Sequence, residues 1–162
     1  MRPSTRPGFL QVGWPWLVAL LVLLLDQLSK AWAVAALAPG QIQPFLPGLL
    51  QLQRVANSGA AFSLLSGNGA ALGMVSALVS LVVAVWLLRR PPRGRWPRLG
   101  LALVLAGALG NGIDRWRLGY VIDFLELVPI HFPIFNVADG AINGAVLCFL
   151  IDLWPQPAAR RD

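Results

Sequence analysis

Four long apolar stretches separated by short polar segments dominate the chain. Each predicts a membrane-spanning helix, because the hydrocarbon core of a bilayer, about 30 Å thick, needs around 20 helical residues. Pro15 suits a helix start, Pro155 ends the last stretch, and the third stretch is short unless it continues through Asp114. The predicted helices are residues 16–37, 70–88, 99–114 and 135–154. Little chain remains outside the membrane, so we predict a single membrane domain over residues 1–162.

The segment 41–66, after the first stretch, has a different pattern. Gln41-Ile42-Gln43 and Leu50-Gln51-Leu52-Gln53 alternate apolar and polar residues, with Pro44, Pro47 and Gly48 between them. Alternation interrupted by turn residues predicts short strands joined by a turn. We expect these strands to lie on the membrane surface.

Composition agrees with a membrane protein. Hydrophobic residues make up 57% of the chain and charged residues 12%, with a mean hydropathy of +0.66. A soluble domain carries roughly 25% charged residues, and a disordered chain has low hydrophobicity, so both classes are excluded. The one cysteine, Cys148, excludes an internal disulfide and a zinc site built on several thiolates.

The positive charges predict an orientation and not a nucleic-acid partner. The net charge is +6, and nine of the 13 Lys and Arg residues precede the first span, join the second span to the third or follow the fourth: Arg2, Arg6, Arg89, Arg90, Arg93, Arg95, Arg98, Arg160 and Arg161. With four spans, all nine lie on one side, which predicts cytoplasmic termini and a cytoplasmic loop 89–98. A cleavable N-terminal signal would place that loop outside, so we expect an uncleaved first helix. The arginines favour contact with anionic lipids.

Ionisable residues inside the predicted spans mark candidate functional positions. Asp26 and Lys30 are four residues apart and share one helix face, which favours a self-neutralising pair that orients the helix. In the third stretch Gly107, Gly110, Asn111 and Asp114 form a stripe of small and polar side chains, and small residues let helices approach closely. We expect Asp114, beside Arg115 and near Arg117, to be an ionised structural anchor.

Two further aspartates carry the candidate chemistry. Asp123 has apolar neighbours on both sides, and burial of that kind raises a carboxyl pKa. Asn136, Asp139 and Asn143 form a polar stripe that begins about 6 Å inside the fourth stretch, where the loop carrying Asp123 can meet it. Two carboxyls in a partly dry site tend to share a proton, as in aspartic peptidases. The spacing alone leaves three interpretations open: a catalytic pair, a polar network that stabilises the bundle, and a proton or ion pathway.

Other polar residues indicate less. His131 is the single histidine, and the acids near it lack metal-ligand spacing, so we predict no metal and no cofactor. We predict that Glu126 is a solvated charge in a loop and that Cys148 is a buried thiol with a packing role. The tryptophans near span ends, Trp14, Trp16 and Trp154, read as interfacial anchors.

Five motifs in order resemble the lipoprotein signal peptidases, also called signal peptidase II. They are Asp26-Gln-Leu-Ser-Lys30, Asn57-Ser-Gly-Ala-Ala-Phe62, Gly110-Asn-Gly-Ile-Asp-Arg115, Val121-Ile-Asp-Phe124 and Phe135-Asn-Val-Ala-Asp139. The resemblance runs from about Trp16 to Trp154. It implies a bacterial inner-membrane aspartic peptidase with four transmembrane helices and a small extracytoplasmic β-cradle between the first two. Such an enzyme is a hydrolase that removes the signal peptide of a prolipoprotein, cutting before the cysteine that carries diacylglycerol.

The resemblance also assigns residues. It makes Asp123 and Asp139 the catalytic pair, with no cofactor. The supporting polar shell would be Asn111, Asp114, Arg115 and Asn136, and the structural or substrate-orienting residues would be Asp26, Lys30 and Asn57. Gly140 departs from the small hydroxyl residue we expect after the second aspartate.

On this interpretation the site lies near the outer face, and the partners are the lipid-modified substrate and membrane lipids. Nothing in the sequence indicates a stable oligomer, so we expect a monomer. The small-residue stripe of the third helix is expected to admit the substrate's signal helix, and segment 41–66 to cover the cleft. Two alternatives from other classes are a small transporter or proton pathway and a non-enzymatic membrane scaffold.

Overall fold

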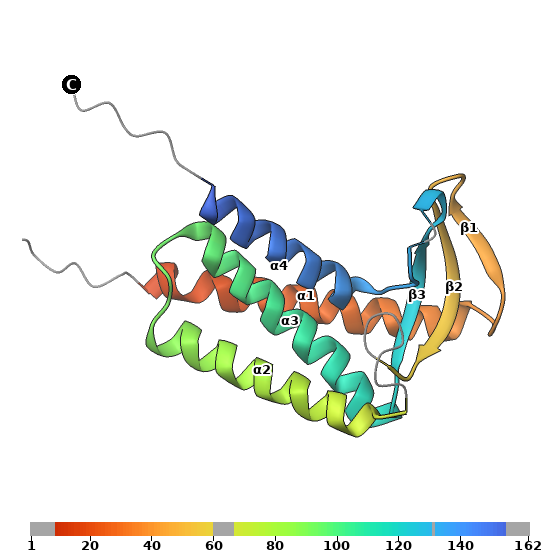
Figure 1. Ribbon diagram of the computed structural model, residues 1–162, viewed down its shortest axis with the longest axis horizontal. Helices are drawn as coiled ribbons and strands as arrows, with labels where there is room; N and C mark the ends of the chain where they lie inside the picture. The colour runs from red at the N-terminus through yellow and green to blue at the C-terminus, as the bar shows by residue number, and fades with distance from the viewer. Residues whose placement is uncertain (1–8, 60–66, 131, 155–162) are drawn as a thin grey trace, which may run out of the picture.

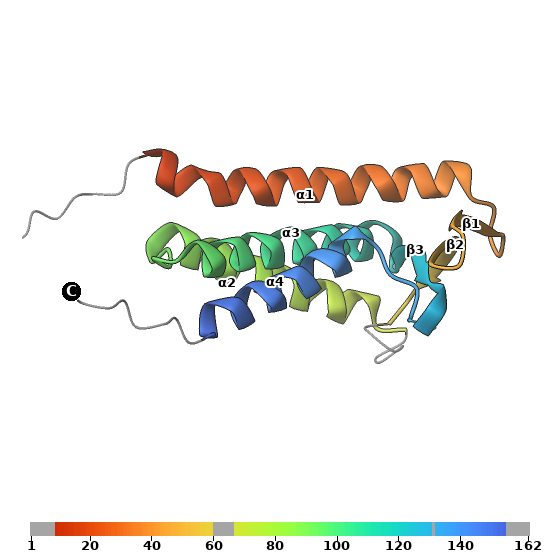
Figure 2. The same cartoon turned by 90° about the horizontal axis from the view of Figure 1, so that it is seen from above.

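Four helices lie side by side with a small sheet across one end (Figures 1 and 2). The computed structural model describes residues 9–59, 67–130 and 132–154. The helices are α1 (Phe9–Ala36), α2 (Gly69–Arg89), α3 (Arg95–Leu118) and α4 (Val137–Leu153). The strands are β1 (Ile42–Leu46), β2 (Leu50–Asn57) and β3 (Val121–Leu127), and a 3₁₀ helix, η2 (Val128–Ile130), follows β3. The α2–α3 connection, the start of α1 and the end of α4 lie at the end opposite the sheet (Figure 1).

Helix α1 begins earlier than the sequence predicted. It starts at Phe9, and Pro15 lies inside it, so the prediction of a start after Pro15 is wrong. Proline lacks a backbone N–H and so removes one hydrogen bond from a helix, but the helix can continue past it. The 28 residues span about 42 Å at 1.5 Å per residue, longer than a hydrocarbon core. The far end of α1 therefore reaches the sheet, where Ala33 and Leu37 pack against Leu52 and Phe124.

The other helices also differ from their predicted bounds. α3 extends the predicted 99–114 at both ends, and α4 begins at Val137, two residues later than predicted. Among the described residues, two segments are long and apolar enough to cross a membrane, Gly13–Ala36 and Gly69–Arg89. α4 has only 17 residues, and α3 carries arginines near both ends. Spanning by α3 and α4 stays a prediction.

The sheet has the antiparallel order β1-β2-β3. β1 and β2 confirm the two strands predicted within 41–66, while residues 60–66 lie outside the described residues. β3, which follows α3, was read from the sequence as a loop, so the placement of the sheet between the first two helices alone is wrong. The run Val121–Leu127 shows too little alternation of apolar and polar residues to predict a strand, because residues on both faces of the strand are at least partly buried.

A short backbone bridge ties β3 to the start of α4. Phe135 N–H donates to the Leu125 carbonyl at 2.9 Å, and Leu125 N–H donates to the Phe135 carbonyl at 2.9 Å. The chain between them folds back on itself, so α4 begins beside β3. This bridge brings the two segments that carry Asp123 and Asp139 together.

Helix α3 is central and packs against α1, α2 and α4. A Cβ at Gly110 would lie 2.5 Å from Asp26 Oδ2 and 3.2 Å from Ala138 Cβ. A Cβ at Gly107 would lie 2.6 Å from both the Ala138 carbonyl oxygen and an Ile142 carbon. The small residues therefore let α1 and α4 approach α3, as the stripe predicted. The expectation that this stripe admits a substrate helix is wrong at Gly110, because α4 and Asp26 already fill that space.

The close approach at Gly110 predicts an effect on stability. Gly110→Ala should destabilise the protein by about 1–3 kcal/mol, because the added methyl group overpacks the interface. Gly140→Ala is the matched control, since a Cβ there meets nothing within 4 Å and should stabilise the helix by about 0.4–1 kcal/mol. Thermal melting of the two variants in detergent measures both effects. A Gly110→Ala variant as stable as Gly140→Ala would contradict the packing.

Candidate active site

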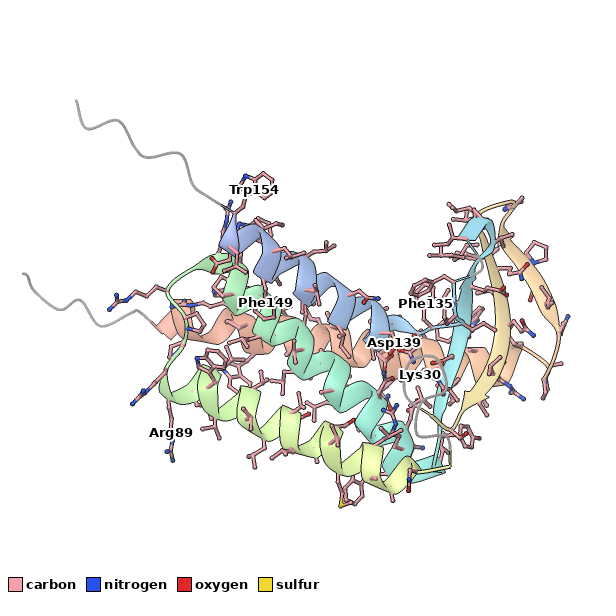
Figure 3. The ribbon with its side chains drawn as sticks, viewed as in Figure 1. Lys30, Arg89, Phe135, Asp139, Phe149 and Trp154 are labelled. Carbon is pink, nitrogen blue, oxygen red and sulfur yellow. The ribbon has the colours of Figure 1, made fainter. Side chains whose placement is uncertain are left out.

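Asp123 and Asp139 line one cavity of about 670 Å³ bounded by α2, α3, α4 and the start of the sheet. Asp123 comes from β3, and Asp139 comes from the first turn of α4, where Figure 3 labels it beside the sheet. The structure thus brings together two acids that are 16 residues apart in sequence. Other polar residues that line the cavity are Asn57, Ser76, Asn111, Arg115 and Asn143.

The Asp123 carboxyl is buried and holds two amides. Its side chain is 2% exposed; Asn57 Nδ2 donates to Oδ2 at 2.8 Å and Asn136 Nδ2 donates to Oδ1 at 2.6 Å. Burial, with a smaller contribution from the nearby Asp139, raises the pKa of Asp123 to about 6, and the two amide hydrogen bonds keep it from rising higher. Asp123 can therefore carry a proton near neutral pH.

This raised pKa predicts a pH-dependent stability. Below a pH of about 4 Asp123 is protonated in both folded and unfolded chains, and its favourable contribution is fully present. As the pH rises through about 6, that contribution is lost, by at most about 1.4 kcal/mol per pH unit. Asp123→Asn, which stays neutral, should therefore gain in melting temperature relative to wild type between pH 4 and 7. An unchanged difference across this range would contradict the raised pKa.

Asp139 is fixed at the beginning of α4 by a capping box with Asn136. Asp139 N–H donates to Asn136 Oδ1 at 3.0 Å, and Asn136 N–H donates to Asp139 Oδ2 at 3.2 Å. Asn111 Nδ2, from α3, donates to the other carboxylate oxygen of Asp139 at 2.7 Å. The acid is held through both oxygens and still lines the cavity.

Asn136 and Asn57 orient Asp123 from two sides. Asn136 is fully buried and touches both acids, because its oxygen accepts from Asp139 N–H while its nitrogen donates to Asp123. Asn57, at the end of β2, accepts from Gly59 N–H at 3.0 Å through Oδ1, so its nitrogen faces Asp123. Val55 pairs with Asp123 across the sheet, which sets this register.

A charged cluster lies behind the two acids. Lys30 Nζ forms ion pairs with Asp26 at 2.9 Å and with Asp114 at 3.0 Å, and all three side chains are buried. The predicted pairing of Asp26 with Lys30 is present. The expected partners of Asp114 were Arg115 and Arg117, whereas its ion pair is formed with Lys30 on α1, because the bundle places α1 beside this face of α3.

The same cluster links the helices to the site. Asp26 Oδ1 accepts from Ala138 N–H at 2.9 Å, and Asp114 Oδ2 accepts from Ile122 N–H at 3.1 Å. Each bond ends one residue away from a candidate acid. Sequence analysis missed Gln27, which donates to Asp26, to Asp114 and to the Gly110 carbonyl. Its place beside Asp26 on a face of α1 that meets α3 was the available signal.

Arg115 faces the cavity, whereas its neighbour Asp114 faces Lys30 on α1. It lines the cavity and donates to the Gly59 carbonyl at 3.2 Å, which connects α3 to the chain after β2.

Glu126, predicted to be a solvated loop charge, lies on β3 and accepts from Gln51 at 2.7 Å. Cys148 is buried, as predicted. His131 lies outside the described residues, and within the described ranges no three His, Cys, Asp or Glu side chains converge as metal ligands.

Comparisons with known proteins decide the family. The family model described as Signal peptidase (SPase) II matches residues 18–155 of this chain. The chain belongs to the signal peptidase II family. The chain is therefore a membrane-associated aspartic peptidase, which confirms the predicted enzyme class and decides against the transporter and scaffold interpretations.

Individual relatives support the signal peptidase II assignment. A lipoprotein signal peptidase of Parasynechococcus marenigrum (strain WH8102) is 54% identical over 144 residues, which cover 89% of this chain and 91% of that protein. A lipoprotein signal peptidase of Gloeobacter violaceus is 49% identical over 138 residues, covering 85% and 80%. A solved bacterial membrane enzyme, determined by the in meso method at 2.3 Å resolution, superposes with a TM-score of 0.81 at 26% identity, covering 91% and 95%. The chain is thus a bacterial membrane protein.

Proposed function

We propose that this chain removes the signal peptide from diacylglyceryl-modified lipoprotein precursors, with Asp123 and Asp139 as its catalytic pair. The observation that carries the proposal is the meeting of these two carboxyls in one cavity, each held by amide donors and joined through Asn136. Membership in the signal peptidase II family and relatives named lipoprotein signal peptidases support the substrate class.

The pair can hydrolyse a peptide bond when one carboxyl is ionised and the other protonated. The carboxylate takes a proton from water, and the water oxygen attacks the carbonyl carbon before the lipid-modified cysteine. The carboxylic acid gives its proton to the carbonyl oxygen. The tetrahedral intermediate then re-forms C=O by returning a hydroxyl proton to the carboxylate that gave it. The C–N bond breaks as the nitrogen takes the proton that the other carboxyl received from water, so both acids regain their starting states. The products are a signal peptide with a free carboxyl group and a cysteine with a free amino group.

The cavity fits an apolar peptide beside a polar reaction centre. Val75 and Val79 from α2, Val104 from α3 and Ile142 from α4 line it away from the sheet, whereas the acids lie at the sheet end. A signal helix can lie along the apolar part and present its last peptide bond to the acids. Binding energy from this apolar part then contributes to positioning the bond.

The exposed apolar faces of the helices favour a bilayer on several sides. Leu28 on α1, Leu78 on α2 and Leu147 on α4 are more than 60% exposed. Exposure of large apolar side chains is unfavourable in water and favourable in the hydrocarbon core of a bilayer. All four helices span the inner membrane in this proposal. The arginine-rich α2–α3 connection lies on the cytoplasmic side and the sheet on the outer side. The enzyme acts as a monomer in contact with membrane lipids.

Cleavage of matched substrates tests the proposal. The purified protein in detergent is given a precursor whose cysteine carries diacylglycerol and the same precursor with a free thiol. Mass spectrometry of the products should show a new amino terminus at the cysteine of the modified precursor, with much slower cleavage of the unmodified one. A folded protein that cleaves neither precursor, or that cuts elsewhere, would overturn the proposed function.

A further inference from the structure

Lys30 has a third partner that its ion pairs do not explain. Its ammonium lies 2.9 Å from Asp26 and 3.0 Å from Asp114, and it also donates to Asn111 Oδ1 at 3.0 Å. Lys30 is 2% exposed, so no bulk water competes for these donors. The two carboxylates already exceed its charge, and the bond to a neutral amide therefore serves a different purpose from neutralisation.

The bond from Lys30 fixes the orientation of the Asn111 amide. Asn111 Oδ1 accepts from Lys30 and, at 3.1 Å, from Asn136 Nδ2, while Asn111 Nδ2 donates to Asp139 Oδ1 at 2.7 Å. A flipped amide would set its NH₂ group against the ammonium and its oxygen against the carboxylate. An ammonium has donors only and an ionised carboxylate only accepts, so Lys30 on one side and Asp139 on the other permit a single orientation of the amide.

We propose that Lys30 is a positioning residue for peptide hydrolysis, because it orients Asn111 and Asn111 holds the Asp139 carboxylate toward the cavity. The inference rests on the proposed function and assigns Lys30 a role beyond its ion pairs. Both bonds in this relay join the Asn111 amide to a charged group, and hydrogen bonds of that kind are shorter and stronger than those between neutral groups.

A double-mutant cycle separates this role from a structural one. Lys30→Met alone would leave two carboxylates buried without a cation, so the cycle is made in an Asp114→Asn background. There, Lys30→Met leaves a single buried carboxylate, and the cluster then carries the same net charge as in the wild type. The four proteins are the background, Lys30→Met, Asn111→Ala and both together. Each is assayed for kcat and KM on the diacylglyceryl-modified precursor and for melting temperature.

Action through Asn111 predicts a non-additive result. In the background, Lys30→Met should lower kcat by about 10- to 100-fold, equivalent to about 1.4–2.8 kcal/mol, with KM changed less than about threefold. With Asn111→Ala already present, Lys30→Met should lower kcat no further. Additive losses, or a kcat loss accounted for by the unfolded fraction, would overturn the inference.

A second variant keeps the test decisive if the Lys30→Met proteins do not fold. Asn111→Ala in the otherwise unchanged chain leaves Lys30 with both ion pairs and removes the relay together with the bond from Asn136 Nδ2. Its kcat, corrected for the unfolded fraction, should fall by the same 10- to 100-fold, and an unchanged kcat would overturn the inference. Cleavage by the wild type alongside shows that the proposed function itself holds, whereas a wild type that does not cleave contradicts that function and not the relay alone.

Discussion

Asp123→Asn and Asp139→Asn should each reduce cleavage of the diacylglyceryl-modified precursor by about 100- to 10,000-fold, the range that one acid–base group contributes. Asparagine matches aspartate in shape and can neither take a proton from water nor supply one to the carbonyl oxygen. Initial rates of signal-peptide release, measured at saturating precursor, give the effect on kcat.

Asp152→Asn is the matched control for these variants. Asp152 lies near the other end of α4, is exposed, and does not line the cavity of the acids. Its replacement should leave the cleavage rate within about twofold of wild type, because surface substitutions have small effects. Near-normal cleavage by either Asp123→Asn or Asp139→Asn, with intact melting, would contradict the catalytic pair.

Asn136→Asp should be nearly as damaging as loss of a catalytic acid. Aspartate remains a good N-cap, so the start of α4 should persist. The new carboxylate, however, replaces the donor that lies 2.6 Å from Asp123 Oδ1 and 3.1 Å from Asn111 Oδ1. Loss of a charged hydrogen bond together with like-charge repulsion predicts a fall in kcat of about 100-fold or more.

Asn136→Ser distinguishes the lost donor from the added charge. Serine also caps helices, yet it is shorter and neutral, so it removes the bond to Asp123 without repulsion. We expect a loss of about tenfold in kcat, between wild type and Asn136→Asp, with similar melting temperatures for the two variants. Wild-type activity in Asn136→Asp would contradict the role of Asn136 in holding Asp123.

The sequence predicted the helices better than the sheet. Long apolar runs specify α1, α2 and α4 because each must bury or expose a continuous apolar surface over many residues. β3 carries Asp123 between apolar residues and lacks clear alternation, so the pattern shows burial of the acid and not the strand. The strand exists because β2 offers it a partner, and such pairing is not visible from the segment itself.

The candidate acids and most of the polar residues around them were identifiable from sequence, whereas most of the contacts that join them were not. The order Asn136-Val-Ala-Asp139 before an apolar run is a capping-box signal, and it sets the helix start at Val137. No local pattern, in contrast, pairs Lys30 with Asp114 or Asn111, since these contacts join residues more than 80 positions apart. Contacts of that range depend on how α1 packs against α3.

The bridge between Leu125 and Phe135 positions the two acids without any contribution from α2, which forms another part of the cavity wall. Asp123 lies two residues before this bridge and Asp139 four residues after it, and their amide partners come from β2, α3 and the N-cap of α4. α2 contributes only Val75, Ser76 and Val79 to the cavity wall. The width of the apolar part of the cavity can therefore change with side-chain size on α2 while the acids keep their spacing. In the proposed enzyme, substitutions on α2 should thus change which signal peptides fit and leave the positions of the two acids unchanged.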